Sequence, residues 1–342
     1  MTHSTPTVGI KDVAREAGVS VGTVSNVLNR PGRVSQRTRR HVEQVIARLG
    51  YVRSESARQL RAGRSRVMAL LVLDMGNPFF VDLAQGAERT ARDAGLAVTL
   101  CNSAQSARKE AEYLELFAEQ RVRGVLVTPA DPSGRSLGDF RRHGIPYVLV
   151  DRVADDAEGC SVSVDDVTGG ALAIRHLTGA GHGSLAYVSG PHHLRQVRDR
   201  RTGALEAIAQ AGLPPTALQE IPTERLDVPA GRDAGARLLG LAQRPTAVFC
   251  ANDLLALGVL QFMYTAGVEV PGDLAIVGYD DIEFAAAATV PLTSVRQPAR
   301  AMGAMAAGLL LQEAGDRADE HRHQHVVFQP ELVVRGSSLP GR

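Results

Sequence analysis

Residues 10–29 read IKDVAREAGVSVGTVSNVLN, and this stretch decides the fold of the first part of the chain. Apolar side chains at positions 10, 13, 14 and 17 recur at the i, i+3, i+4, i+7 spacing of one helix face. Gly18 is typical of the end of such a helix, and Ser20 is typical of the N-cap of the next one. Two short helices joined by so tight a turn are what a helix-turn-helix unit requires.

A third helix and a polar segment follow this pair. Ser35 and Gly50 suit the two ends of a helix whose apolar positions 42, 45, 46 and 49 share one face. Three short helices around one small core predict a domain over residues 1–52. Residues 53–66 are polar and rich in arginine, with Leu60 as a prominent apolar side chain, and predict a hinge helix or linker.

The net charge of +1 for the 342-residue chain hides a strong asymmetry. Residues 1–66 hold thirteen Lys and Arg against four Asp and Glu, so this segment carries +9 and the remaining 276 residues carry −8. Neutralisation of phosphates by such a segment supplies most of the non-specific affinity of a protein for DNA. The charge therefore favours a DNA-binding head over a three-helix unit that binds protein.

From residue 67 onwards, apolar runs alternate with amphipathic helical stretches. The runs occupy residues 67–73, 96–101, 124–128, 147–150, 185–188, 247–250 and 274–277, and the helical stretches occupy 79–94, 108–120, 168–178, 200–211, 232–241 and 253–266. Strands without polar alternation are buried on both faces, so this rhythm predicts an α/β fold of parallel sheets covered by helices. Their number favours two lobes, with a ligand cleft at the carboxyl ends of the strands.

Motifs along the whole chain add a more specific signal. Those in the head are residues 10–20, 23–29, 32–35, 49–51 and 57–61, and those in the core are residues 77–80, 144–146, 150–152, 251–253 and 277–281. In this order they resemble the lactose-repressor (LacI/GalR) family. The resemblance implies an all-α helix-turn-helix head and a two-lobed core similar to periplasmic binding proteins. It predicts lobe 1 at about residues 67–162 and 295–325, and lobe 2 at about 163–294 and 326–336, within a core of 67–342.

The resemblance also implies the function. The expected protein is a sequence-specific regulator of transcription, a repressor whose affinity for its operator is controlled by a small molecule, a sugar or sugar derivative. Its expected partners are a pseudo-palindromic double-stranded DNA operator and a second copy of the chain. A dimer is expected rather than a tetramer, because the C-terminal heptad helix of tetrameric relatives is not found after residues 331–335. The sequence allows the effector to be either an inducer or a corepressor, and no cofactor is expected.

In such a protein the second helix would lie in the major groove. Val21 and Gly22 are smaller than the residues that the family often carries there, and Asn26 stands where the family often has arginine. The hydroxyl groups of serine and threonine can form hydrogen bonds to DNA phosphates, and the amide of an asparagine can pair with adenine. The candidates for DNA binding are Thr7, Ser20, Val21, Gly22, Thr23, Ser25, Asn26, Asn29, Arg33, Tyr51, Ala57, Arg58, Leu60 and Arg61.

A second set of residues would hold the effector, mostly polar groups that follow strands. The candidates are Asp74, Asn77, Phe79, Phe80, Thr128, Asp151, Arg200, Asn252, Asp280 and Gln297. A guanidinium can clamp vicinal hydroxyls or a carboxylate. The alternatives are core packing for the two rings, and loop capping or salt bridging for the polar groups. Leu226 and Val162 stand where relatives often have aromatic residues, which disfavours a pyranose. A phosphorylated or smaller polar effector stays open because three arginines lie nearby: Arg195, Arg198 and Arg201.

Other patterns exclude or disfavour other classes of protein. Residues 321–325 read HRHQH, but alternate histidines before a strand at 326–328 are typical of a solvated loop, so no metal site is predicted. No nucleophile–base set, Walker motif, GxSxG or HExxH is found, which argues against an enzyme.

Three scattered cysteines and no secretion signal predict a cytoplasmic protein. A solute-binding protein of an uptake system, the main alternative, would have a signal peptide and no basic head.

We expect Leu60→Ala to weaken specific operator binding while non-specific binding at low salt stays nearly unchanged. In the family, the leucine that matches Leu60 wedges into the minor groove, and such unstacking costs a few kcal/mol that bending repays. Titrations of the variant against operator and random DNA measure both affinities. An equal loss of the two would contradict the wedge and favour the alternative, in which Leu60 packs on the core.

Overall fold

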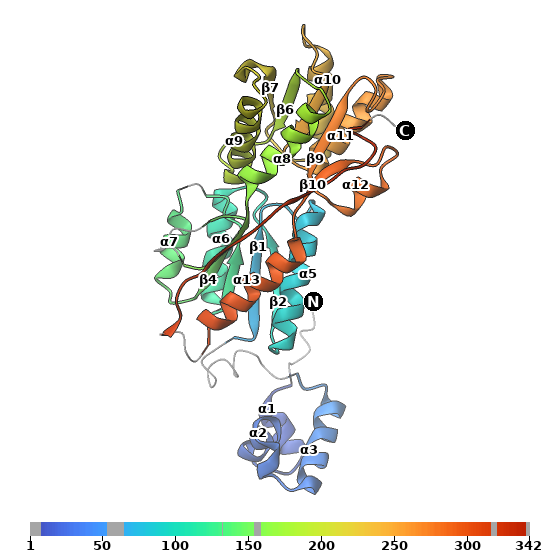
Figure 1. Ribbon diagram of the computed structural model, residues 1–342. Coiled ribbons are helices and arrows are strands. Elements are labelled where there is room, and N and C mark those ends of the chain that lie inside the picture. The colour runs from blue at the N-terminus through green and yellow to red at the C-terminus, as the bar shows by residue number, and fades with distance from the viewer. Residues whose placement is uncertain (1–7, 53–64, 132, 154–158, 316–319, 340–342) are drawn as a thin grey trace. The chain divides into compact units, whose positions relative to one another are not determined.

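The computed structural model describes residues 8–52, 65–131, 133–153, 159–315 and 320–339. The chain divides into two compact units, Met1–Ser65 and Arg66–Arg342, which we call the head and the core (Figure 1). Within the described ranges, no helix is both long and apolar enough to cross a membrane. Each unit has a hydrophobic interior of its own, as the alternation of sequence patterns predicts.

The head contains the three predicted helices. They are α1 (Ile10–Glu16), α2 (Val21–Asn29) and α3 (Gln36–Leu49), with a 3-10 turn at Pro31–Arg33. The predicted caps form as well: the Oγ of Ser20 accepts a hydrogen bond from the backbone N–H of Thr23 at 3.0 Å, and the Oγ of Ser35 accepts one from Thr38 at 3.2 Å. Gly50 ends α3 in the left-handed conformation, with φ of 62°.

The first sheet of the core is entirely parallel. Its strands are β1 (Val67–Val72), β2 (Ala97–Asn102), β3 (Gly124–Val127), β4 (Tyr147–Val150), β5 (Ser161–Val164) and β11 (His325–Phe328), in the order β11-β5-β4-β3-β1-β2. One face packs against α5 (Pro78–Asp93) and α13 (Ala299–Glu313), and the other against α6 (Ala107–Glu119) and α7 (Arg135–Arg141). Leu70 of β1 faces the first pair of helices and Leu71 faces the second, so both faces are buried.

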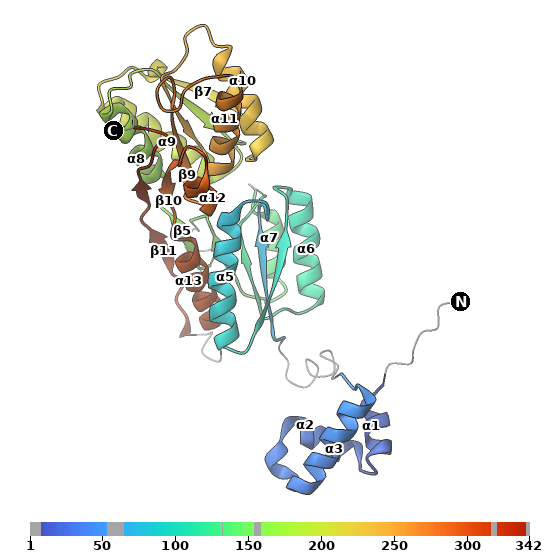
Figure 2. The ribbon, with the colours of Figure 1, turned by 90° about the vertical axis from the view of Figure 1, so that its right-hand side faces the viewer.

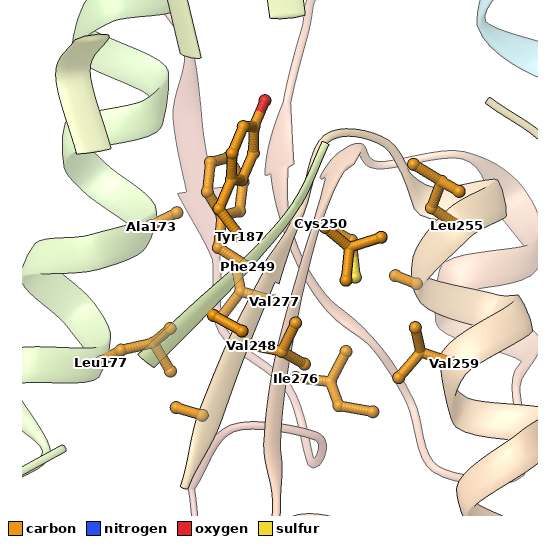
Figure 3. Close-up of a cluster of buried hydrophobic side chains, with 14 of the residues drawn as sticks. Ala173, Leu177, Tyr187, Val248, Phe249, Cys250, Leu255, Val259, Ile276 and Val277 are labelled. Atoms are coloured by element: carbon orange, nitrogen blue, oxygen red, sulfur yellow. The ribbon is translucent and has the colours of Figure 1, made fainter. Parts of the chain in front are cut away.

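The second sheet has the same architecture with one antiparallel edge. Its strands are β6 (Leu185–Ser189), β7 (Leu218–Pro222), β8 (Ala247–Cys250), β9 (Ala275–Asp280), β10 (Thr293–Arg296) and β12 (Glu331–Val333), in the order β12-β10-β9-β8-β6-β7. The helices of this lobe are α8 (Asp166–Gly179), α9 (Arg195–Gln210), α10 (Val228–Leu239), α11 (Asp253–Thr265) and α12 (Glu283–Ala287), with a 3-10 turn at Pro215–Ala217. Figure 3 shows Leu177 and Val259 packing onto the strands from opposite sides.

The chain crosses between the two sheets three times, after β5, β10 and β11 (Figure 2). The lobe boundaries expected at residues 162/163, 294/295 and 325/326 fall inside β5, β10 and β11, whereas the sheets divide the chain at the ends of these strands. β10 lies whole in the second sheet, and β5 and β11 lie whole in the first, where Val162 pairs with Val326 and Val164 pairs with Phe328. Their apolar residues continue up to the crossing, so the sequence pattern does not mark where one lobe ends.

Three pairs of helices approach closely because glycines face the backbone of the partner helix. A Cβ on Gly86 of α5 would overlap the carbonyl of Arg300, and a Cβ on Gly303 of α13 would overlap the carbonyl of Leu83. The same reciprocal arrangement joins α8 to α9 and α10 to α11, through Gly170 with Gly203 and Gly231 with Gly258. These contacts leave no room for a side chain.

We therefore expect Gly303→Ala to lower the free energy of unfolding by about 1–3 kcal/mol, because the added methyl must push α13 away from α5. Gly308→Ala on the same helix is the matched control, since no atom lies within 4 Å of its added Cβ. This control should be stabilised by up to about 1 kcal/mol through helix propensity. Thermal denaturation of both variants measures the difference. An equally stable Gly303→Ala protein would contradict the close approach of the two helices.

Candidate functional site

A pocket in the core collects nine of the ten effector candidates. It is narrow, with free space for water-sized molecules of only about 30 Å³. Its lining consists of Leu73, Asp74, Asn77, Phe79, Phe80, Gln105, Asp151, Gln196, Arg200, Leu226, Asn252, Asp280 and Gln297. These residues come from both lobes and from the crossing after β10, so the pocket is the cleft that the strand pattern predicts.

The carboxyl ends of the strands position the polar groups. Asp151 follows β4, Asn252 follows β8, Asp280 ends β9 and Gln297 follows β10. Asp151 and Asp280 have φ angles of 58° and 106°, which non-glycine residues rarely adopt. Strained residues of this kind are retained where surrounding contacts hold them, and they concentrate at binding sites.

The carboxylate of Asp280 is held from two sides. Its Oδ2 accepts a hydrogen bond from Asn77 Nδ2 at 2.8 Å, and its Oδ1 accepts one from Gln297 Nε2 at 2.7 Å. Asn77 also caps α5, since its Oδ1 accepts the N–H of Phe79 at 3.0 Å. Burial raises the pKa of Asp280, although the Arg200 charge and the two amides partly oppose this rise.

Arg200 is fixed by contacts on three sides. Its Nε donates to Asp166 Oδ1 at 2.8 Å and its Nη1 donates to the Ala251 carbonyl at 2.6 Å. The guanidinium carbon lies 3.7 Å from the centre of the Tyr279 ring, and only 3% of the residue is exposed. An arginine held in this way lines the pocket in one orientation, which reduces the entropy lost when a ligand binds.

Asp151 is only partly satisfied by hydrogen bonds. Its Oδ2 accepts a hydrogen bond from Gln196 Nε2 at 3.2 Å, whereas its buried Oδ1 has no partner among the described residues. Burial raises the pKa of Asp151 well above the usual range, and the charges of Asp166 and Asp280 raise it further. The Oε1 of Gln297 is likewise buried without a described partner. Unsatisfied buried acceptors at a pocket are suited to the donors of a ligand.

Some sequence expectations about the cleft do not match the geometry. Thr128 is buried at the end of β3 and does not line the pocket. Val162 lies in the core of the first sheet, whereas Leu226 does line the cleft. Gln196 was missed, although it stands one helical turn before Arg200 on the same face of α9. Gln105 reaches the pocket from the loop after β2 and has no sequence signal of this kind.

The three arginines that kept a phosphorylated effector open are bound elsewhere. Arg195 pairs with Asp199 and Arg201 pairs with Glu220, while Arg198 donates to the carbonyl of His192. None of the three lines the pocket. The arginine that does line it, Arg200, is already paired with Asp166, so the cleft has a surplus of carboxylates.

In the head, α2 presents a small polar surface. Val21, Gly22 and Asn26 are exposed on it, while Thr23 and Ser25 are half-buried. The hydroxyls of Ser20 and Thr23 bond to each other at 2.9 Å. The amide of Asn29 donates to the carbonyl of Ser25 at 2.8 Å, so part of this side chain stabilises the helix itself.

The exposed cations of the head fall into two groups. Arg15, Arg39 and Arg48 pair with acidic residues of the head. Lys11, Arg30, Arg33, Arg37 and Arg40 are exposed and have no acidic partner within the described ranges. Tyr51 packs against the apolar interior of the head. The candidates Thr7, Ala57, Arg58, Leu60 and Arg61 lie outside the described residues.

Known proteins resemble this chain over nearly its whole length. Residues 9–54 match the family model of bacterial regulatory proteins, lacI family, and residues 174–338 match a periplasmic binding protein-like domain. The chain is 33% identical to the HTH-type transcriptional repressor PurR of Photobacterium profundum, over 96% of this chain and 98% of that protein. It is 34% identical to the ribose operon repressor of Escherichia coli (strain K12), over 96% and 99%.

Solved structures match the fold as well. A LacI family transcriptional regulator from Enterococcus faecium with bound ribose has a TM-score of 0.74 and 28% identity, over 81% of this chain and 100% of that one. The lac repressor dimer bound to operator and the anti-inducer ONPF has a TM-score of 0.83 and 25% identity, over 97% and 99%. The predicted fold of a helix-turn-helix head and a core of two parallel-dominated sheets is confirmed.

We expect Asp151→Asn to raise the thermal stability of the ligand-free protein at pH 7. Because the pKa of Asp151 is raised in the folded state, ionisation costs stability as the pH rises above the unfolded value of about 4. The amide removes that cost, so the gain in stability is largest near neutral pH and shrinks towards pH 4. Asp139→Asn, an exposed carboxylate paired with Arg142, is the control. A gain that did not depend on pH would contradict this explanation.

Proposed function

The chain belongs to the LacI family of bacterial regulatory proteins, and from this we propose that it represses transcription by binding an operator under the control of an effector. The observation that carries the proposal is the presence, on one chain, of a basic helix-turn-helix head and a polar cleft between two lobes. Since the operator is genomic DNA, we place its activity in the cytoplasm. It acts by binding and conformational change, and we propose no catalytic step for it.

The head supports the DNA-binding half of the proposal. A recognition helix reads base edges from its N-terminal turns, where Val21, Gly22 and Asn26 are exposed on α2. The small side chains leave Asn26 as the main candidate for a direct base contact through its amide. Exposed arginines without acidic partners among the described residues, such as Arg33 and Arg37, can neutralise phosphates. The lac repressor binds its operator as a dimer, and we propose a dimer here.

The cleft supports a neutral polyhydroxylated effector. Carboxylates and amides such as Asp151, Asp280 and Asn252 accept or donate hydrogen bonds to hydroxyl groups. The surplus of carboxylates disfavours a phosphate group, and Phe79 adds an aromatic residue to the lining of the pocket. Ribose is bound by the Enterococcus faecium relative. We therefore propose a sugar of about pentose size.

The hydrogen bonds that join the lobes suggest how the effector acts. Asn77 of the first lobe bonds to Asp280 of the second, and Gln196 of the second bonds to Asp151 of the first. Hydroxyl groups of an effector compete for these carboxylates and so change the free energy of the lobe arrangement in which these two hydrogen bonds form. Such a ligand shifts the equilibrium between lobe arrangements by its difference in affinity for them. Either sign of the effect, induction or corepression, follows from this scheme.

A gel-shift titration against the DNA upstream of the protein's own gene tests the proposal. We expect a retarded band at moderate salt, and an affinity for the specific site about 10- to 100-fold lower for Asn26→Ala. Gln44→Ala, which removes an exposed amide on α3, is the matched control and should bind normally. If no band forms with the wild-type protein, a solute-binding protein becomes the better interpretation.

The same titration with and without ribose tests the effector. We expect ribose to change the operator affinity of the wild-type protein and to raise its melting temperature. Asp151→Asn should still bind the operator but should lose both responses, whereas Asp139→Asn should keep them. A melting temperature that responds to another neutral sugar instead would replace ribose in the proposal. A response to sugar phosphates alone would contradict the proposed effector class.

A further inference from the structure

Four side chains with metal-binding atoms meet at one end of the first lobe. They are Cys160 just before β5, Glu313 at the end of α13, and His321 and His323 before β11. One ligand atom from each lies within 4.8 Å of all the others. The sequence pattern alone favours solvated histidines here, because alternate histidines before a strand are typical of a solvated loop and Cys160 is far from them in the chain.

The separations within this cluster suit a single cation. The Sγ of Cys160 lies 3.1 Å from His321 Nε2 and 4.0 Å from His323 Nδ1. The Oε1 of Glu313 lies 3.5 Å from His321 Nε2 and 3.1 Å from His323 Nδ1. Sulfur, nitrogen and oxygen ligands at about 2.0–2.3 Å from a tetrahedral Zn²⁺ lie about 3.3–3.6 Å from one another. The observed distances scatter around that range.

The four side chains differ in how exposed they are, in a way that fits a bound ion. Cys160 is fully buried, and the side chains of His321 and Glu313 are only 7% and 9% exposed. The side chain of His323 is 45% exposed, which leaves a path for an ion from solvent. The backbone N–H of Gln324 points at the sulfur, with the nitrogen 3.3 Å away, and such a bond stabilises a metal-bound thiolate.

We propose that Cys160, Glu313, His321 and His323 form a tetrahedral Zn²⁺ site. A set of one thiolate, two imidazoles and one carboxylate suits a borderline-soft cation and disfavours Mg²⁺ and Ca²⁺, which take oxygen ligands. The site is separate from the effector cleft, because Cys160 precedes β5 whereas the cleft residues follow the carboxyl ends of the parallel strands.

Binding at this site has a defined proton balance and a structural effect. When Zn²⁺ binds to the Cys160 thiol, a Zn–S bond forms, the S–H bond breaks and the proton goes to solvent. The ion ties the edge strand β11 to β5 and α13, which stabilises the folded core.

Cobalt substitution tests the site on the full-length, tag-free protein after removal of metals with a chelator. We expect one equivalent of Co²⁺ to give a thiolate charge-transfer band and the intense visible bands of tetrahedral Co²⁺, which one equivalent of Zn²⁺ then removes. Zn²⁺ should raise the melting temperature of the metal-free protein, and Mg²⁺ should not. Absence of the thiolate band in the wild-type protein would overturn the proposal.

Variants connect the signal to these residues. Cys160→Ser should abolish the charge-transfer band, whereas Cys101→Ser, the matched control, should keep it. His321→Asn and Glu313→Gln should each keep the wild-type fold without metal and should weaken Co²⁺ binding by at least about tenfold. These two variants keep the test decisive if Cys160→Ser fails to fold. A full-strength band in Cys160→Ser, or unchanged Co²⁺ affinity in both other variants, would show that the metal binds elsewhere.

Discussion

The two lobes of the core depend on one buried carboxylate, that of Asp280. It accepts hydrogen bonds from Asn77, which starts a helix of the first lobe, and from Gln297, which lies in a crossing between lobes. A charge buried in this way is costly unless it is hydrogen-bonded, so both amides are held against it. The backbone of Asp280 also has a rare φ of 106° at this point. The shape of the cleft follows from this clamp, since its three participants all line the pocket.

The cleft could be predicted from the sequence to the extent that it follows the ends of strands. Asp151 and Asn252 come directly after buried apolar runs, and parallel strands bring their carboxyl ends to one edge. Thr128 shows where this rule stops. It follows β3 in the same way, but the side chain is buried away from the pocket, and an apolar run does not reveal which face its last residue takes. Gln105 enters from a loop, which periodicity cannot place.

The strands that are apolar could be predicted from the sequence, whereas strands that contain polar residues could not. Residues 161–164 read SVSV, yet β5 is buried on both faces. The hydroxyl of Ser161 bonds to Nδ1 of His325 at 3.0 Å, whereas the buried hydroxyl of Ser163 has no partner among the described residues. Thr293 of β10 is satisfied, as Ser161 is, by a hydrogen bond with Ser338 at 2.7 Å. The partners lie far away in the chain, so the sequence shows only a polar residue without its acceptor. The cluster around Cys160 was missed for this reason as well.

The shortness of the crossings limits how the lobes can move. Only Asp165 separates β5 from α8, only Gln297 and Pro298 separate β10 from α13, and only residues 329–330, which read QP, separate β11 from β12. Proline fixes φ in two of these three links. Because links of one or two residues leave little slack, we expect any relative motion of the lobes to be a rotation about the crossings. Gln297 is both such a link and a hydrogen-bond donor to Asp280, so this carboxylate is tied directly to one of the crossings between the lobes.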